Sequence, residues 1–323
     1  MKTTLLPAIA LTCFGAIGTC AAEPMLAVIT RGDGAVNLYR ARGIGLQLIK
    51  SVPAGKRPGE MCLDPNGKRL FVGQVAEKSI AELDLATQSV VATMTDPGLK
   101  NPDGCAVSPD SSKLYMIDST GDAVFVFSTS SHQLVAKIPV GKEPRRALFS
   151  TDGKMLLVSN AHSDTISVID PAAGKVVREV KTGKEPRDML WTPDGKLLVV
   201  ALVVDDCIAY FAADSLALDR QVGTERSPQR IAITSDGAML FSLSRYQNSV
   251  SVADLTEGGE RRFVNSIPVG RFAFNMAMSA DGKTLYTSHS QLDNTISVID
   301  VRLMKVMNTI SGGNTPVAML YIK

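Results

Sequence analysis

The sequence predicts an all-β protein, a seven-bladed β-propeller made of four-stranded antiparallel blades. Three observations predict it: a repeat of about 42 residues, an Asp-Gly type of turn inside each repeat, and short apolar runs on either side of that turn. The turn recurs around Asn66, Asp110, Asp152, Asp194, Asp236 and Asp281, at intervals of 44, 42, 42, 42 and 45 residues. A period in the low forties with strands and no helix is typical of propellers.

Each repeat is expected to form four strands in order. The turn joins the first two strands, because glycine accepts the positive φ that a tight hairpin needs. The third strand alternates apolar and polar residues, and the same hexapeptide occurs at Thr165–Asp170 and Thr295–Asp300. The fourth run contains prolines such as Pro139, which cannot donate to a sheet ladder. The fourth strand is therefore predicted at the outer edge and the first strand at the centre.

The number of blades follows from the second strands. These are predicted at Leu26–Thr30, Leu70–Gly73, Leu114–Asp118, Leu156–Asn160, Leu198–Leu202, Leu240–Ser244 and Leu285–His289. The chain starts with a second strand and ends with a first strand at Pro316–Tyr321. The two ends are expected to share one blade, which closes the ring and removes exposed sheet edges. An open solenoid is the alternative.

These motifs resemble the YVTN-repeat β-propeller family. Leu156–Asn160 matches its Leu-Tyr-Val-Thr-Asn motif and Thr165–Asp170 its Thr-Val-Ser-Val-Ile-Asp motif, and the similarity extends over nearly all of residues 24–323. Blade 1 and residues 203–210 depart most. The resemblance implies the fold but no single function, because the relatives include surface proteins and subunits beside quinone- or haem-dependent dehydrogenases.

Residues 1–22 have the order of a secretory signal: Lys2, an apolar run at Leu5–Ile17, and small residues before a cleavage site after Ala22. We expect a single propeller domain over residues 23–323 and a periplasmic or secreted location. Lipid attachment at Cys20 is a rival interpretation. The rest of the chain contains no apolar segment long enough to span a membrane.

Charge and cysteine usage exclude some classes of protein. The chain has 34 Lys and Arg against 32 Asp and Glu, a balance that argues against nucleic-acid binding by bulk electrostatics. Cys62, Cys105 and Cys207 remain after the signal. Their odd number and their spacing match no disulfide or zinc framework. Each is therefore predicted to be a small buried apolar residue.

Two kinds of loop are expected on one face, which we call the top face: the crossings from a fourth strand to the next first strand, and the loops between second and third strands. The Asp-Gly turns lie on the opposite, bottom face, where their Asp residues form turns. The crossings differ between blades. Residues just past the proline of each crossing start the innermost strand, so four arginines should converge at the mouth of the central channel: Arg145, Arg146, Arg187 and Arg230.

The predicted convergence needs compensating charge. Two guanidinium groups about 8 Å apart repel by about 2 kcal/mol at an effective dielectric constant near 20. Glu60, Glu143, Glu185 and Asp188 can supply it within the protein, which gives a self-paired ring of charges. Water and an anionic ligand are the other sources, and an anion is suited to the place because arginine presents a rigid fork of donors to carboxylates and phosphates.

The top face also carries histidines and variable loops. His162 and His289 belong to blades that are nearly opposite, so we do not expect them to share a metal ion. Either one alone has the chemistry of an axial haem ligand or a general acid or base. The loop residues Arg245, Tyr246, Gln247 and Asn248 lie on the same face and are candidates for shaping a pocket.

The chain lacks the sequence motifs of several kinds of catalytic or cofactor site. The chain has no Cys-x-x-Cys-His for covalent haem, no His-Glu-x-x-His, no Walker A loop and no Gly-x-Ser-x-Gly. Metal-dependent propeller lactonases place carboxylates and an Asn at the channel mouth. Glu60, Asp103, Asp188 and Asn275 imitate that set, but the four arginines among them oppose a divalent cation.

The sequence therefore predicts an exported binding protein whose top face recognises a ligand or partner. The candidate binding residues are Glu60, Arg145, Arg146, His162, Arg187, Asp188, Arg230, Asn275 and His289, with no metal site and no identifiable cofactor or catalytic residue. An anionic small molecule or a periplasmic redox protein is the expected partner of a monomer, and the family resemblance implies an accessory role in a redox or catabolic system. The alternatives are an enzyme at the channel mouth (a lactonase or lyase, or an oxidoreductase with noncovalent haem or quinone) and a surface role without a pocket.

Overall fold

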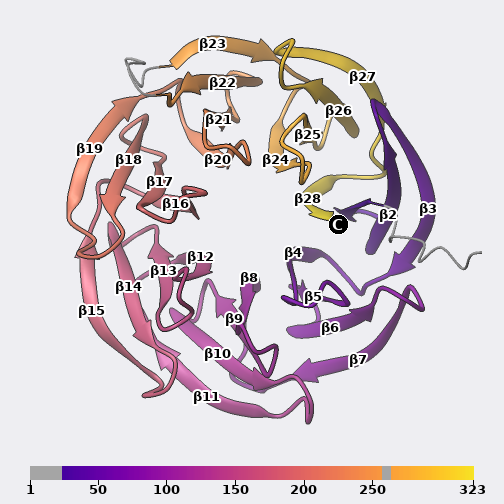
Figure 1. The fold of residues 1–323 in the computed structure, drawn as a ribbon. Coiled ribbons are helices and arrows are strands. Elements are labelled where there is room, and N and C mark those ends of the chain that lie inside the picture. The colour runs from indigo at the N-terminus through magenta and orange to yellow at the C-terminus, as the bar shows by residue number, and fades with distance from the viewer. Residues whose placement is uncertain (1–23, 257–262) are drawn as a thin grey trace, which may run out of the picture.

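The computed structural model describes residues 24–256 and 263–323, which form 28 β-strands in seven four-stranded antiparallel sheets. The sheets are arranged as blades around a central axis (Figure 1). None of these residues belongs to a helix that is long and apolar enough to cross a membrane. The predicted fold class and blade count are confirmed.

Each blade has four strands, which follow one another from the axis outward. Blade 1 contains β28 (Pro316–Ile322), β1 (Met25–Thr30), β2 (Ala35–Arg42) and β3 (Gly45–Pro53). Blade 2 contains β4 (Pro58–Leu63), β5 (Arg69–Gln74), β6 (Ser79–Asp84) and β7 (Ser89–Thr95). Blade 3 contains β8 (Pro102–Val107), β9 (Lys113–Asp118), β10 (Ala123–Ser128) and β11 (Leu134–Pro139). Blade 4 contains β12 (Pro144–Phe149), β13 (Leu156–Asn160), β14 (Thr165–Asp170) and β15 (Lys175–Lys181).

The remaining blades follow the same order. Blade 5 contains β16 (Pro186–Trp191), β17 (Leu197–Leu202), β18 (Cys207–Ala212) and β19 (Leu218–Gly223). Blade 6 contains β20 (Pro228–Ile233), β21 (Met239–Ser244), β22 (Ser249–Asp254) and β23 (Phe263–Pro268). Blade 7 contains β24 (Ala273–Met278), β25 (Thr284–His289), β26 (Thr295–Asp300) and β27 (Lys305–Ser311).

The ring is closed by the two ends of the described chain. Strand β1 pairs with β2 on one side and with β28 on the other, and Leu26 lies opposite Tyr321 in the β1–β28 pair. This pairing gives β1 a hydrogen-bonded neighbour on both edges, so blade 1 has the same four strands as the other six. The predicted closure is confirmed.

The repeated Asp residues stabilise turns on the bottom face. Asp152 Oδ1 accepts hydrogen bonds from Ser150 Oγ at 2.7 Å and from the Lys154 N–H at 3.1 Å. Gly153, which follows it, has a φ of 71°, in the left-handed region that favours glycine. The predicted role of these Asp residues as turn formers is confirmed.

The hydrophobic core lies between neighbouring blades. Tyr115 of blade 3 and Phe149 of blade 4 form an edge-to-face pair with ring centroids 5.4 Å apart, inside a buried cluster with Ile117 and Val158. Because each blade packs against two others in this way, the inner strands and their loops are held by a continuous ring of packed side chains. That ring fixes where the top-face side chains lie.

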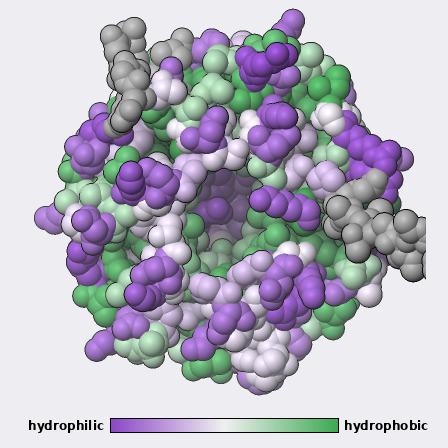
Figure 2. Space-filling view, in the orientation of Figure 1, coloured by the Kyte–Doolittle hydropathy of each residue, from purple (hydrophilic) through white to green (hydrophobic). Residues whose placement is uncertain are grey.

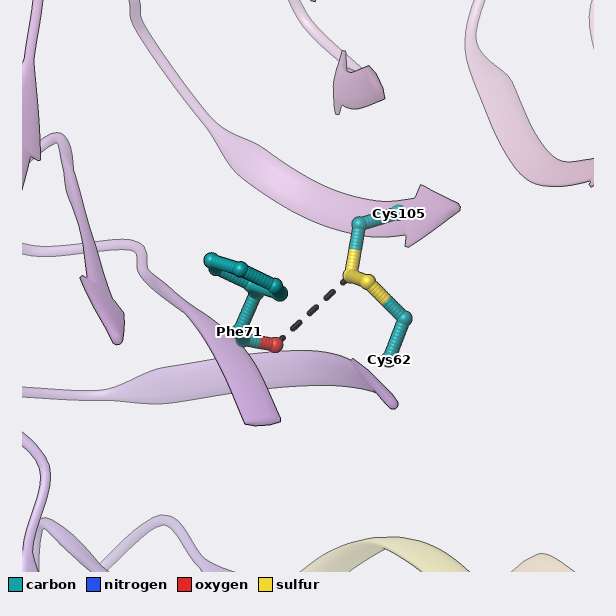
Figure 3. Close-up of a disulfide and its surroundings, with 3 residues drawn as sticks. All are labelled: Cys62, Phe71 and Cys105. Atoms are coloured by element: carbon teal, nitrogen blue, oxygen red, sulfur yellow. Dashed lines mark hydrogen bonds between the residues drawn. A yellow bond between two sulfur atoms is a disulfide. The ribbon is translucent and has the colours of Figure 1, made fainter. Parts of the chain in front are cut away.

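A disulfide corrects the prediction that all three cysteines are unpaired. Cys62 on β4 and Cys105 on β8 are bonded, with their Cα atoms 5.7 Å apart and a sequence separation of 43 residues (Figure 3). The Cys105 sulfur lies 3.6 Å from the carbonyl oxygen of Phe71 on β5. The two cysteines occupy nearly the same place in consecutive repeats, and the innermost strands of neighbouring blades converge. A search for short local spacings therefore misses the pair. Cys207 is free and buried, as predicted.

Candidate functional site

Five of the predicted site residues meet inside the channel. They occupy equivalent places, two residues past the start of the innermost strand, and we call them the channel ring: Glu60 on β4, Arg146 on β12, Asp188 on β16, Arg230 on β20 and Asn275 on β24. The face drawn in Figure 2 is hollowed at its centre, and hydrophilic residues lie within the hollow. The convergence expected from the repeat is therefore found.

The channel ring contains an ion pair that crosses the channel. Arg230 pairs with Glu60, although β20 and β4 lie on opposite sides of the axis (Figure 1). The Asn275 Nδ2 donates to Glu60 Oε1 at 3.4 Å and to the Val317 carbonyl at 3.3 Å. Side chains of blades 2, 6 and 7 therefore bridge the channel at this level.

Asp188 is the negative centre of the other half of the ring. Its Oδ1 lies 3.3 Å from Arg146 Nε and 3.8 Å from Arg230 Nη1, and its Oδ2 accepts a hydrogen bond from the Ile231 N–H at 3.0 Å. Burial raises the pKa of Asp188, while Arg146 and the backbone N–H groups of Ile231 and Met189 act in the opposite direction. Burial also lowers the pKa of Arg230, to about 10.

Arg145 and Arg187 lie one residue nearer the top face. Arg145 pairs with Glu143, and its Nη1 is 3.7 Å from Asp103 Oδ2. Arg187 Nη1 is 3.4 Å from Glu185 Oε1. Burial is the main cause that lowers the pKa of Arg145, and repulsion by Arg187 adds to it. The acids expected to compensate the arginines do so.

Two further arginines reach the mouth from loops between second and third strands. The Arg31 Nε donates to the Pro58 carbonyl at 3.2 Å, and the Arg245 guanidinium lies 4.9 Å from the centroid of the Phe274 ring. Among the described residues, neither arginine forms an ion pair. Burial lowers the pKa of each. For Arg31, Asp103 acts in the opposite direction and Arg57 adds to the lowering, and for Arg245, Tyr246 opposes the lowering while Arg187 and Arg31 add to it.

We call Arg31, Arg145, Arg187 and Arg245 the mouth arginines. The repeat predicts Arg245 on this face, whereas Arg31 was not predicted. The available signal was departure from the repeat, because the first loop residue after the second strand is Arg in blades 1 and 6. In the other blades that place is taken by Val75, Ser119, Ala161, Val203 and Ser290.

A cavity of about 380 Å³ opens beside the mouth, between blades 5 and 6. Its charged lining includes Arg187, Arg226 and Arg245 together with Glu185 and Asp206. Val203, Val204 and Tyr246 supply apolar surface. The expectation that the loop at residues 245–248 shapes a pocket is thus confirmed for Arg245 and Tyr246. We call this space the top cavity.

The two predicted histidines lie apart from the ring. His162 is exposed on the rim, and its Nδ1 is 2.6 Å from Glu143 Oε2. His289 corrects the prediction of an accessible top-face histidine, because it is fully buried at the end of β25. The Gly270 N–H donates to its Nε2 at 3.2 Å, and its Nδ1 lies 3.0 Å from Thr295 Oγ1. With its ring enclosed and hydrogen-bonded, His289 is not placed to ligate haem or transfer a proton to a ligand.

Buried His289 is expected to make stability depend on pH. Burial lowers its pKa from 6.5 to about 4, and protonated Nε2 would face the Gly270 N–H. Below pH 6.5 the unfolded chain binds the proton first, so the free energy of unfolding falls as pH decreases from 6.5 to 4, by about 3 kcal/mol in total. Urea unfolding at several pH values measures this slope.

The matched variant for that measurement is His289→Asn, because Asn160 occupies the equivalent place in blade 4 and bonds Thr165 as His289 bonds Thr295. The variant is expected to show a flatter pH dependence between 6.5 and 4. Equal slopes in the two proteins would contradict the assignment.

The acidic side chains of the channel are already engaged. Glu60 pairs with Arg230, Asp103 lies beside Arg145, and Asp188 lies between two arginines. Within residues 24–256 and 263–323, no group of three or more His, Cys, Asp or Glu side chains is arranged to hold a metal ion. The arrangement presents guanidinium groups, rather than free carboxylates, to a ligand.

Residues 106–256 match the family model of YNCE-like β-propellers. This match and the seven-bladed fold confirm the resemblance to repeat propellers. No curated protein matches the chain.

Solved structures share the fold at low sequence identity. The periplasmic gluconolactonase of Pseudomonas aeruginosa is 18% identical with a TM-score of 0.77, and the alignment covers 93% of this chain and 99% of that one. A putative 6-phosphogluconolactonase of Bacteroides fragilis is 15% identical with a TM-score of 0.78, over 95% and 99% of the two chains. A chain of Kuenenia stuttgartiensis hydrazine synthase is 20% identical with a TM-score of 0.71, over 81% and 88%. At these identities the likeness shows the fold alone.

Proposed function

We propose that this chain is an exported β-propeller that binds an anionic ligand, a carboxylate or a phosphate, at the mouth of its channel on the top face. The observation that carries the proposal is the excess of guanidinium groups there. Arg145 and Arg187 form ion pairs with acidic partners, whereas Arg31 donates to a carbonyl with Asp103 as a nearby attractive charge, and Arg245 lies against an aromatic ring.

Electrostatics favours an anion in this place. Arg245 is repelled by both Arg187 and Arg31, and Arg145 by Arg187. A bound carboxylate or phosphate would offset this repulsion and accept charge-assisted hydrogen bonds, which are shorter and stronger than neutral ones. The half-buried position of Arg245 strengthens the effect, because water screens the charge less there.

The channel ring would form the floor of the site. Because the Arg230–Glu60 pair crosses the channel below the mouth arginines, a ligand would enter and leave by the top face. A channel bridged by its own side chains is also what a surface protein without a pocket would have. The top cavity of about 380 Å³ beside the mouth favours ligand binding instead.

Export is supported by the signal-like residues 1–22, which lie outside the described residues, and by the Cys62–Cys105 disulfide. Disulfides persist in oxidising compartments such as the periplasm and are rare in the cytosol. We therefore propose a periplasmic or secreted location, in which both cysteines are oxidised in protein taken directly from cells. Reduced thiols in such protein would count against export.

The setting that we propose is an accessory role beside a periplasmic redox or catabolic enzyme. Its support is the family resemblance and the propeller fold shared with a hydrazine synthase chain. The lactonase alternative is supported by two proteins of the same fold, a putative 6-phosphogluconolactonase and a periplasmic gluconolactonase. We favour binding over metal-dependent hydrolysis, because arginines engage the carboxylates that a cation would need. A visible chromophore in protein from the native source would favour the redox alternative.

Calorimetric titration of the purified chain with acetate and with inorganic phosphate tests the proposal. Hydrogen bonds to charged groups contribute about 1.5 to 3 kcal/mol, so Arg187→Ala and Arg245→Ala are each expected to weaken anion binding about tenfold or more. Arg302→Ala is the control, because Arg302 is exposed in a bottom-face turn. Binding should also weaken as salt is added. Absence of binding, or equal binding by all three variants, would refute the proposal.

A further inference from the structure

We infer that the ligand of the top cavity carries an aromatic ring beside its oxyanion. This inference rests on the proposed function and specifies the chemical class of ligand. It arises from the second wall of the cavity, where Tyr246 and Val204 face the same space as Arg187 and Arg245.

The apolar wall is made of residues that depart from the repeat. The second loop residue after the second strand is Ala76, Thr120 and His162 in blades 2 to 4, but Val204 and Tyr246 in blades 5 and 6. The top cavity lies between those same two blades. Large apolar side chains thus occur at this loop position on both sides of the cavity.

These side chains are left open to solvent. Val204 is 57% exposed and Tyr246 is 75% exposed, although the equivalent side chains of other propeller loops are small or polar. An aromatic ring stacked against Tyr246 would remove apolar surface from water and gain the offset contacts that aromatic pairs prefer. Tyrosine is suited to this contact, because it offers a rigid surface at little cost in conformational entropy.

The polar wall complements a charged group on the same ligand. Arg187 and Arg245 present guanidinium groups to the cavity, and Arg226 adds a third from the crossing into β20. Glu185 forms an ion pair with Arg187, and Asp206 accepts a hydrogen bond from the Ser227 N–H at 2.7 Å. These two acids therefore do not neutralise the three arginines of the cavity. A neutral aromatic molecule would leave this wall uncompensated.

The size of the cavity limits the ligand. At about 380 Å³ it lies near the lower end of the range of small-molecule sites. That space fits one ring with one oxyanion better than a nucleotide or a peptide. A ring carboxylate and a ring phosphate ester share the required chemistry, and only direct comparison separates them.

The experiment compares four probes by calorimetric titration of the full chain: benzoate, phenyl phosphate, acetate and benzamide. Benzoate or phenyl phosphate is expected to bind about tenfold more tightly than acetate, and benzamide more weakly than benzoate. The preferred oxyanion is read from the ratio of the first two. Tyr246→Ala is expected to reduce benzoate affinity to the level of acetate, whereas Tyr246→Phe keeps the preference.

Leu292→Ala is the control, because Leu292 is 59% exposed in the corresponding loop of blade 7 and does not line the cavity. Equal affinity for benzoate and acetate would overturn this inference and leave the proposed function standing. Failure of every anion to bind would overturn the proposed function itself. Binding of benzamide as tight as that of benzoate would overturn the pairing of ring and charge.

Discussion

The variant Asp188→Ala is expected to lower the free energy of unfolding by about 3 to 5 kcal/mol. Asp188 is 5% exposed and lies between Arg146 and Arg230. Its removal takes the acidic partner from Arg146, whose side chain is 38% exposed, leaves Arg230 paired with Glu60 alone, and frees the Ile231 N–H from its acceptor. Removing one partner of a buried charge network costs more than the network contributes, because the remaining charge stays buried.

Urea unfolding followed by circular dichroism measures this loss. Asp214→Ala is the matched control, because Asp214 is exposed in a bottom-face turn of the same blade and is expected to change stability by no more than about 0.5 kcal/mol. Asp188→Asn, which keeps the shape but not the charge, should fall between the two. A loss below about 1 kcal/mol for Asp188→Ala would mean that the channel ring is not held by this charge.

Loss of the Cys62–Cys105 bond is the second large effect, expected at about 2 to 4 kcal/mol. The bond closes a loop with a sequence separation of 43 residues and so restricts the unfolded chain. It also joins the innermost strands of blades 2 and 3, where the channel wall is made. The double variant Cys62→Ala, Cys105→Ala removes the bond without leaving a single reactive thiol.

Reductant supplies the internal control for this measurement. A reducing agent should destabilise the unchanged protein and Cys207→Ala alike, but not the double variant, because Cys207 is unpaired. If the double variant and the unchanged protein unfold at the same urea concentration under oxidising conditions, the bond contributes little to stability.

The fold could be predicted almost completely because the same pattern of strands and turns recurs in seven consecutive units. The second strand of blade 4 was expected at Leu156–Asn160 and is found there, and Tyr321 pairs with β1 as the closure requires. Convergence of Arg146, Asp188 and Arg230 also followed, since equivalent places in a repeat lie at one level of the channel.

The features that the sequence did not predict are contacts between side chains of different blades, which depend on how the blades are placed relative to one another. The Cys62–Cys105 bond arises where the inner strands of neighbouring blades approach one another, and no local spacing encodes that approach. Glu60 was expected to compensate the arginines, but its choice of Arg230 depends on the width of the channel. His289 was misplaced for a different reason. It ends a predicted strand beside a top-face loop and was therefore expected to be accessible, but the crossing at Gly270 packs over it and hides it from solvent.

The pairing of β28 with β1 makes folding depend on contact between distant parts of the chain. Until Pro316–Ile322 reaches β1, blade 1 lacks its innermost strand, and the molecule is an open arc whose exposed strand edges are prone to joining those of neighbouring molecules. A variant without β28 is therefore expected to stay open and to aggregate.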